Sequence, residues 1–297
     1  NLNPRDFTNA RNYPQKLDTQ VNLPKMEGGG LDAAFFIVYV GQGSLTQEGY
    51  DRAYAQAVEK FDAVHRFTKE IAPQRMGLAL TAADVRTIAA SGRKVALIGI
   101  ENAYSLGTSL ARVKEFHDRG GRYMSLAHNG HSQFADSNTG ERDGKFMHNG
   151  LNELGRQVIG EMNKWGLMVD VSHPSKQANL QAIALSKAPV IASHSAARAL
   201  ADHSRNLDDE QLEALKKNGG VIQTVAFDSY VKLKPADSAE RAAAIAKLRV
   251  EMGLQGGPAS QTDATRSQFR ARMAAIDTQF PPPPMATVAD FVNHIDY

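Results

Sequence analysis

Four ionisable side chains stand directly after apolar stretches of the sequence. Glu101 follows KVALIGI, His128 follows RYMSLA, His173 follows GLMVDVS and His194 follows APVIAS. Taken singly, such a residue is expected to hydrogen-bond nearby backbone or to cap the next helix. Four of them in succession, three being His in a chain with only nine, favour one shared site.

Two imidazoles and a carboxylate are a competent ligand set for zinc or another borderline divalent ion, with a position left for water or substrate. Water bound to such a metal has its pKa lowered toward about 7, which provides a hydroxide nucleophile without Ser or Cys. Since the chain has no cysteine, any metal must be held by His, Asp or Glu. Glu101 is the best candidate to bridge two metals, because a carboxylate has two oxygens. Hydrolysis is the predicted chemistry.

Other polar residues are weaker candidates. His131, Asp136 and His148 lie in the long loop HNGHSQFADSNTGERDGKFMHNG, where they either line the mouth of the site or only make the loop polar. Arg205 stands eleven residues after His194. It could clamp a carboxylate through two parallel hydrogen bonds or form a surface salt bridge, and the sequence leaves both open.

The elements that must position these residues alternate along the chain. The expected strands are apolar runs, mostly continuous, as in strands buried on both faces of a parallel sheet: 33–40, 94–100, 122–127, 166–172, 188–193 and 220–227. Helical patterns lie between them, several closing on Gly: 48–71, 81–92, 109–120, 152–166 and 208–219. This order predicts an α/β architecture, either an open doubly wound sheet or a closed barrel. A closed barrel would gather the four strand-end groups at one mouth.

The segment from about 232 to 280 breaks this alternation. It is rich in Ala, Arg and Gln in two amphipathic helical patterns, with a GGPAS turn between them, and predicts a helical hairpin insertion. The run PPPP at 281–284 predicts an extended connection into a last amphipathic helix, TVADFVNHIDY. We therefore expect one barrel domain over 1–297 with an insertion at about 232–280.

Composition excludes several classes of protein. A chain with 42% hydrophobic and 22% charged residues is typical of a soluble globular protein. Its net charge of +2 comes from interleaved basic and acidic residues, so nucleic acid is not an expected partner. No apolar run reaches the roughly 18 residues of a membrane span, and the polar start has no signal-peptide core. Cytoplasmic and exported locations both stay open.

At these residues the chain resembles the membrane (renal) dipeptidase family, zinc peptidases on a TIM barrel of the metal-dependent hydrolase type. The resemblance runs through most of the chain and is carried by these stretches: VNLPKMEGGGLDAAFFIVYV, ALIGIENAYSLG, RYMSLAHNGHSQFADS, GLNELGRQVIGEMNKWGLMVDVSHPS and APVIASHSAARALADHSRNLDDEQL. It implies a (β/α)8 barrel that hydrolyses the peptide bond of dipeptides with a metal-bridging hydroxide.

The resemblance also implies a role for each residue of the site. Glu101 would bridge two Zn²⁺ ions, His173 and His194 would complete the second metal position, His128 would contact the substrate and polarise the scissile carbonyl, and Arg205 would bind the substrate carboxylate. The developing oxyanion would be stabilised by the metals and His128. Family members are often dimers, which leaves a homodimer open.

Two features of the family pattern are missing from the sequence. No His-x-Asp motif precedes VNLPKMEGGG, and no Asp-Phe-Asp-Gly-like segment with an acid/base Asp follows NHIDY. We expect both to belong to terminal barrel segments of a longer parent protein. Two alternatives remain: a hydrolase of another amide, such as a β-lactam or an acylated amino acid, and a non-catalytic barrel that has lost metal ligands.

Overall fold

The computed structural model describes residues 21–254 and 263–297 and divides the chain into two compact units, Asn1–Val225 and Ala226–Tyr297. The polar start of the sequence and the GGPAS turn lie outside the described residues. Each unit is described by itself below.

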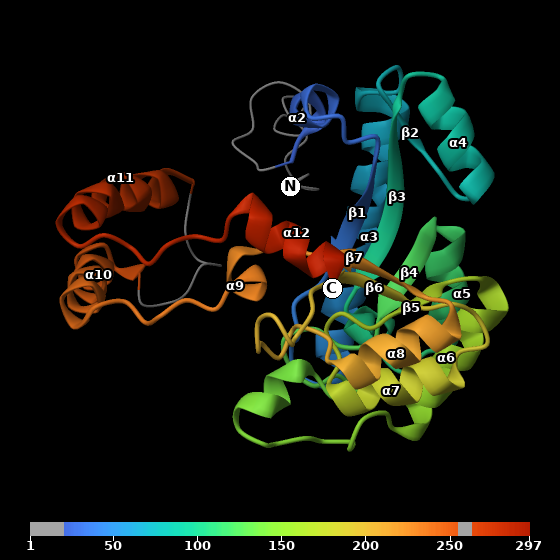
Figure 1. Cartoon of the computed structure of the whole chain (residues 1–297). Helices are drawn as coiled ribbons and strands as arrows, with labels where there is room; N and C mark the ends of the chain where they lie inside the picture. The colour runs from blue at the N-terminus through green and yellow to red at the C-terminus, as the bar shows by residue number, and fades with distance from the viewer. Residues whose placement is uncertain (1–20, 255–262) are drawn as a thin grey trace. The chain divides into compact units, whose positions relative to one another are not determined.

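A seven-stranded, all-parallel sheet forms the centre of the first unit (Figure 1). Its strands are β1 (Ala33–Tyr39), β2 (Met76–Leu78), β3 (Lys94–Glu101), β4 (Gly121–Ser125), β5 (Met168–Asp170), β6 (Ile191–Ser195) and β7 (Val221–Thr224). They pair in the order β1-β3-β4-β5-β6-β7, and β2 pairs with the first residues of β3. The predicted parallel α/β sheet is confirmed. Strand β2 was not predicted, because three residues are too few to show a pattern.

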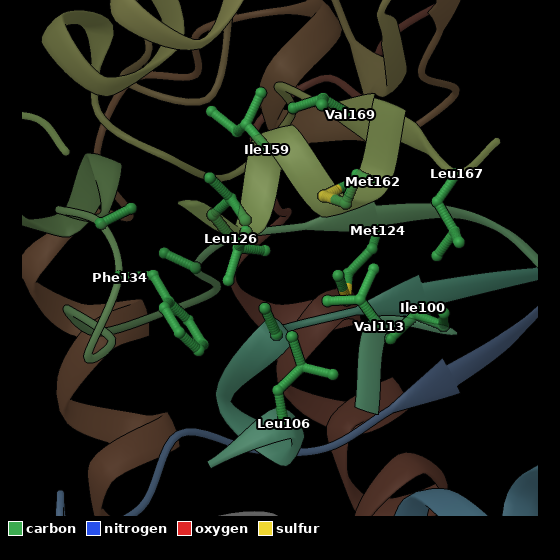
Figure 2. Close-up of a cluster of buried hydrophobic side chains, with 14 of the residues drawn as sticks. Ile100, Leu106, Val113, Met124, Leu126, Phe134, Ile159, Met162, Leu167 and Val169 are labelled. Carbon is green, nitrogen blue, oxygen red and sulfur yellow. The ribbon is translucent and has the colours of Figure 1, made fainter. Parts of the chain in front are cut away.

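Strand β3 contributes several side chains to the buried core of this unit. Ile98 and Ile100 are fully buried on it, and the intervening Gly99 leaves room for a neighbouring ring. A Cβ at Gly99 would lie only 2.2 Å from Cζ of Tyr123 on β4. Figure 2 shows Ile100 and Met124, from adjacent strands, within one apolar cluster that α5 and α6 also enter. The continuous apolar run at 94–100 therefore corresponds to a strand that is covered on both faces, whereas β7 at the end of the sheet is partly exposed.

Helices precede, connect and follow the strands of this unit. They are α2 (Leu23–Gly28), α3 (Gln47–Arg66) with a π-helical turn η1 (Phe67–Ile71), α4 (Ala82–Ala90), α5 (Ala111–Asp118), α6 (Glu153–Trp165), α7 (Lys176–Leu185) and α8 (Asp209–Asn218), together with the short 3-10 turns η2 (Ala103–Leu106) and η3 (Asn138–Arg142). Helices α5 to α8 form a series in which each packs against the next (Figure 1). Gly166 and Gly219 end α6 and α8 in the left-handed conformation, as the sequence predicted. Within the described ranges, each helix is too short or too polar to span a lipid bilayer.

The sheet is curled, and its chain of paired strands ends at β1 on one side and at β7 on the other. Among the described residues these two strands pair with no further strand. The structure thus shows a parallel α/β sheet of the kind that a TIM barrel contains, whereas closure into eight strands stays a prediction.

The second unit consists of helices: α9 (Asp228–Val231), α10 (Ala239–Glu251), α11 (Asp263–Gln279) and α12 (Val288–Asp296). Arg241 on α10 donates hydrogen bonds of 2.8 Å to Oδ1 of Asp277 on α11 and to the carbonyl oxygen of Phe280. The two predicted helical patterns of the hairpin therefore form helices that contact each other. The four prolines lie in a stretch without regular secondary structure between α11 and α12.

Candidate metal centre

The carboxyl ends of four neighbouring strands carry the candidate residues. Glu101 is the last residue of β3, and His194 is the fourth residue of β6. His128 and His173 each follow their strand, β4 or β5, by three residues. Because β6 pairs with β7 as far as Ser195, past an irregularity in register after Ala192, His194 belongs to the strand rather than to the loop after it.

The distance between Glu101 and His194 shows how strongly the sheet curls. Strands β3 and β6 are separated by β4 and β5, so in a flat sheet their backbones would lie about 14 Å apart. Yet Oε1 of Glu101 lies only 3.3 Å from Nε2 of His194. The curl therefore directs side chains from several strands toward one point.

Three of the predicted residues meet there as a possible ligand set. Nε2 of His173 lies 2.8 Å from Oε1 of Glu101 and 2.9 Å from Nε2 of His194. Ligand atoms on a tetrahedral zinc, with bonds of about 2.0–2.1 Å, lie roughly 3.3 Å apart. The spacing observed is close to that value, so a small outward movement would admit a metal ion. Within the described ranges, these residues are the one group of acidic and His side chains with this geometry.

Burial and hydrogen bonding set the charge states of the cluster. Burial raises the pKa of Glu101, but hydrogen bonds with His128, His173 and His194 outweigh it and hold that pKa well below its usual range. Burial lowers the pKa of His173 to about 3, and the charge of Arg205 acts in the same direction. At neutral pH the site therefore contains a carboxylate and a neutral His173 imidazole, which are the forms that bind metals.

His128 lies beside this group. Its Nε2 is 3.5 Å from Oε1 of Glu101, and its ring centroid is 4.0 Å from that of His173. Its Nδ1 is buried and accepts or donates no hydrogen bond within the described part of the chain. His128 is thus placed to contact a molecule bound at the cluster.

Tyr39 and Lys60 border the site and were not singled out from the sequence. Tyr39, the last residue of β1, is paired with Glu101 in the sheet, and its ring centroid lies 4.6 Å from that of His128. Lys60 Nζ donates to the carbonyl oxygen of Tyr39. Burial lowers the pKa of Lys60, although the charge of Glu101 opposes this shift. A tyrosine at the end of an apolar strand, in register with Glu101, is the signal that could have identified this position.

Arg205 is buried near the end of β6, with 3% of its surface exposed. Its Nη2 lies 3.5 Å from the carbonyl oxygen of His194, and its charge contributes to the low pKa of His173. Burial argues against the surface salt bridge that the sequence left open. A buried guanidinium beside the cluster fits better with the binding of an anionic group.

The polar residues of the long loop after β4 stabilise that loop instead of joining the cluster. The carboxylate of Asp136 is fully buried and accepts hydrogen bonds from the backbone N–H groups of Met147, His148 and Gly150. His131 Nδ1 lies 3.2 Å from the same carboxylate. Of the two interpretations of these residues, the geometry supports ordinary loop structure.

Comparison with known proteins agrees with this geometry. Residues 2–297 match the family model described as membrane dipeptidase (peptidase family M19). The chain is 34% identical over 227 residues to dipeptidase aclJ of Aspergillus oryzae, covering 75% of this chain and 53% of that protein. It is 35% identical over 223 residues to dipeptidase tcpJ of Claviceps purpurea, covering 74% of this chain and 51% of that protein.

Solved structures show the same relationship. The structure is similar to that of the probable dipeptidase PvdM from Pseudomonas aeruginosa, with a TM-score of 0.74 and 28% identity, covering 95% of this chain and 74% of that one. The chain spans about half the length of the two curated fungal relatives. The family resemblance inferred from the residues is confirmed, and the chain belongs to the membrane dipeptidase family of peptidases.

Proposed function

We propose that this chain carries the metal centre of a dipeptidase, an enzyme that hydrolyses the peptide bond of a dipeptide. The observation that carries the proposal is the meeting of Glu101, His173 and His194 atoms at distances of 2.8–3.3 Å. A divalent metal bound there would supply an activated water as nucleophile. Family membership and the names of the curated relatives, which are dipeptidases, support the same function.

We assign the remaining roles from position and charge. His128, next to the cluster, would hydrogen-bond the scissile carbonyl oxygen and stabilise the charge that develops on it. Arg205 would bind the carboxylate of the substrate, because a guanidinium offers two parallel donors to a carboxylate. A free C-terminal carboxylate on the substrate is therefore part of the proposal.

The number and identity of the metals are also proposed. Zinc suits two imidazoles and one carboxylate. Glu101 would bridge two zinc ions in this proposal, because a carboxylate has two oxygens and its contacts with the imidazoles all involve Oε1. A second position would need ligands in addition to His173 and His194. In the same proposal, the curled sheet belongs to a closed (β/α)8 barrel with a helical insertion at about 232–280.

The test combines metal analysis with a substrate panel. We expect purified protein to contain zinc and to cleave dipeptides with a free C-terminal carboxylate, with turnover lost on chelation and restored by zinc. Amidating that carboxylate should abolish turnover if Arg205 binds it. Zinc binding without turnover of any substrate would contradict the proposed dipeptidase activity and favour a non-catalytic binding protein. Turnover of β-lactams or acylated amino acids alone would change the proposed substrate.

A further inference from the structure

A buried hydrogen-bond relay lies behind the His194 ring. Oγ of Ser193 is 2.7 Å from Nδ1 of His194 and 2.7 Å from Oδ2 of Asp170. Asp170 is the last residue of β5 and is fully buried, and Ser193 lies on β6 with 9% of its surface exposed. The relay therefore connects two strands directly beneath the candidate metal ligands.

The direction of each hydrogen bond in this relay follows from counting protons. A carboxylate can only accept, so the contact between Ser193 and Asp170 requires the single hydroxyl proton of Ser193. The same hydroxyl can then only accept from His194, which places a proton on Nδ1. A neutral imidazole protonated on Nδ1 carries its lone pair on Nε2. That is the His194 atom that faces Glu101 and His173.

Backbone contacts fix the orientation of the Asp170 carboxylate. Its Oδ1 accepts from the N–H groups of Ser172 and Ser193 at 3.1 and 3.0 Å, which leaves Oδ2 for the Ser193 hydroxyl. The N–H of His194 donates to Oγ of Ser172 at 2.9 Å, so the backbone behind the ring is also held. By contrast, Nδ1 of His173 is buried without a hydrogen-bond partner within the described residues.

We propose that Asp170 and Ser193 are positioning residues that keep His194 protonated on Nδ1, with the Nε2 lone pair directed at the metal. This inference rests on the proposed metal centre. Groups that hydrogen-bond the second nitrogen of a metal-binding His orient the ring and raise its basicity, and their loss typically lowers metal affinity 10- to 100-fold.

Asp170→Asn is the most informative variant, because it should reverse the relay without changing its shape. The two backbone N–H groups require an acceptor, so the amide oxygen takes the place of Oδ1 and the NH₂ group faces Ser193. Ser193 then accepts from that amide and donates to Nδ1, which moves the imidazole proton to Nε2. We expect zinc affinity, measured by competition with a chromophoric chelator, to fall about 10- to 100-fold.

A second readout does not depend on metal. In the chelated protein, ¹⁵N NMR of the imidazole should show His194 protonated on Nδ1 in the wild type and on Nε2 in Asp170→Asn, with the resonance assigned from its loss in His194→Gln. A wild-type imidazole protonated on Nε2 would overturn the proposal, even if Asp170→Asn does not fold. If the wild type shows the Nδ1 form but binds no metal, the proposed function fails while the relay stands.

Ser195→Ala provides the matched control for Ser193→Ala. Ser195 lies on the same strand and is fully buried, but its hydroxyl hydrogen-bonds Ser172 rather than the His194 ring. We expect Ser193→Ala to lower zinc affinity at least about tenfold and Ser195→Ala to leave it within about twofold of the wild type. Equal losses in the two variants would mean that any buried hydroxyl here matters, and the relay would be rejected.

Discussion

The two units of the chain differ in the side chains that they bury and expose. In Asn1–Val225, polar side chains such as Asp170 and His173 are buried at the ends of strands and hydrogen-bonded to one another or to backbone. In Ala226–Tyr297, large apolar side chains are exposed, with Val288 at 80% and Met285 at 68%.

This difference accompanies a division of roles, because the residues of the proposed metal centre all belong to the first unit. A buried carboxylate is tolerated only where hydrogen bonds compensate for the loss of water, and a large apolar core around the site is what excludes that water. Every residue assigned to the metal centre lies in the first unit. Three of the four predictions below pair a change in each unit, and all four follow in order of decreasing effect.

Glu101→Gln should have the largest effect. The amide keeps the size of the side chain but removes the charge at the centre of three imidazole contacts, so we expect bound metal to be lost and kcat/KM to fall at least about 10³-fold. The matched change in the second unit is Glu251→Gln, which removes only a surface ion pair with Arg272. Its kcat/KM and metal content should equal those of the wild type, and a similar loss there would refute the separation.

Phe116→Ala tests the core of the first unit. Phe116 is fully buried and packs on the ring of Phe61, with centroids 5.3 Å apart. Its truncation should lower the free energy of unfolding by about 3–5 kcal/mol. Phe227→Ala, at a position 55% exposed in the second unit, should change it by less than about 1 kcal/mol. Urea denaturation measures both, and equal effects would show that exposure does not distinguish the units.

The metal-free protein should lose stability as the pH falls. The unfolded chain binds a proton at His173 below about pH 6.5, whereas burial lowers the folded pKa to about 3. Between these values the unfolded state holds one more proton, so the free energy of unfolding decreases by up to roughly 1.4 kcal/mol for each pH unit lowered. His173→Asn should remove this part of the slope in urea titrations between pH 6.5 and 4; an unchanged slope would assign it to other groups.

Two helix caps provide the smallest and most local comparison. The Ser175 hydroxyl accepts from the N–H of Ala178 in α7, and the Thr287 hydroxyl accepts from the N–H of Asp290 in α12. Replacing either by Ala should cost about 1 kcal/mol. Hydrogen exchange should show faster opening only in the helix whose cap was removed. Faster exchange of α7 in Thr287→Ala would reveal coupling between the units.

Much of the fold was predictable from sequence, because buried parallel strands appear as continuous apolar runs. Strand β2 was too short to detect, and α7 (KQANLQAIAL) was not singled out because its apolar residues form no clear stripe. The meeting of Glu101, His173 and His194 was expected from their places after successive strands. Asp170 and Ser193 were missed, since a sequence does not show which hydroxyl and carboxylate face each other across two strands. Burial of Arg205 likewise depends on tertiary packing.

The spacing of the three candidate ligands along the chain has a consequence for folding. His173 is 72 residues from Glu101 and 21 residues from His194, so one ion bound to all three would close two loops at once, as a cross-link does. A ligand that binds only the folded state stabilises it by RT ln(1 + [L]/Kd), which is about 4 kcal/mol at a thousandfold excess over Kd. The atoms proposed for catalysis would therefore also hold three strands of the sheet together, and zinc supply would change the fraction of chains that is folded.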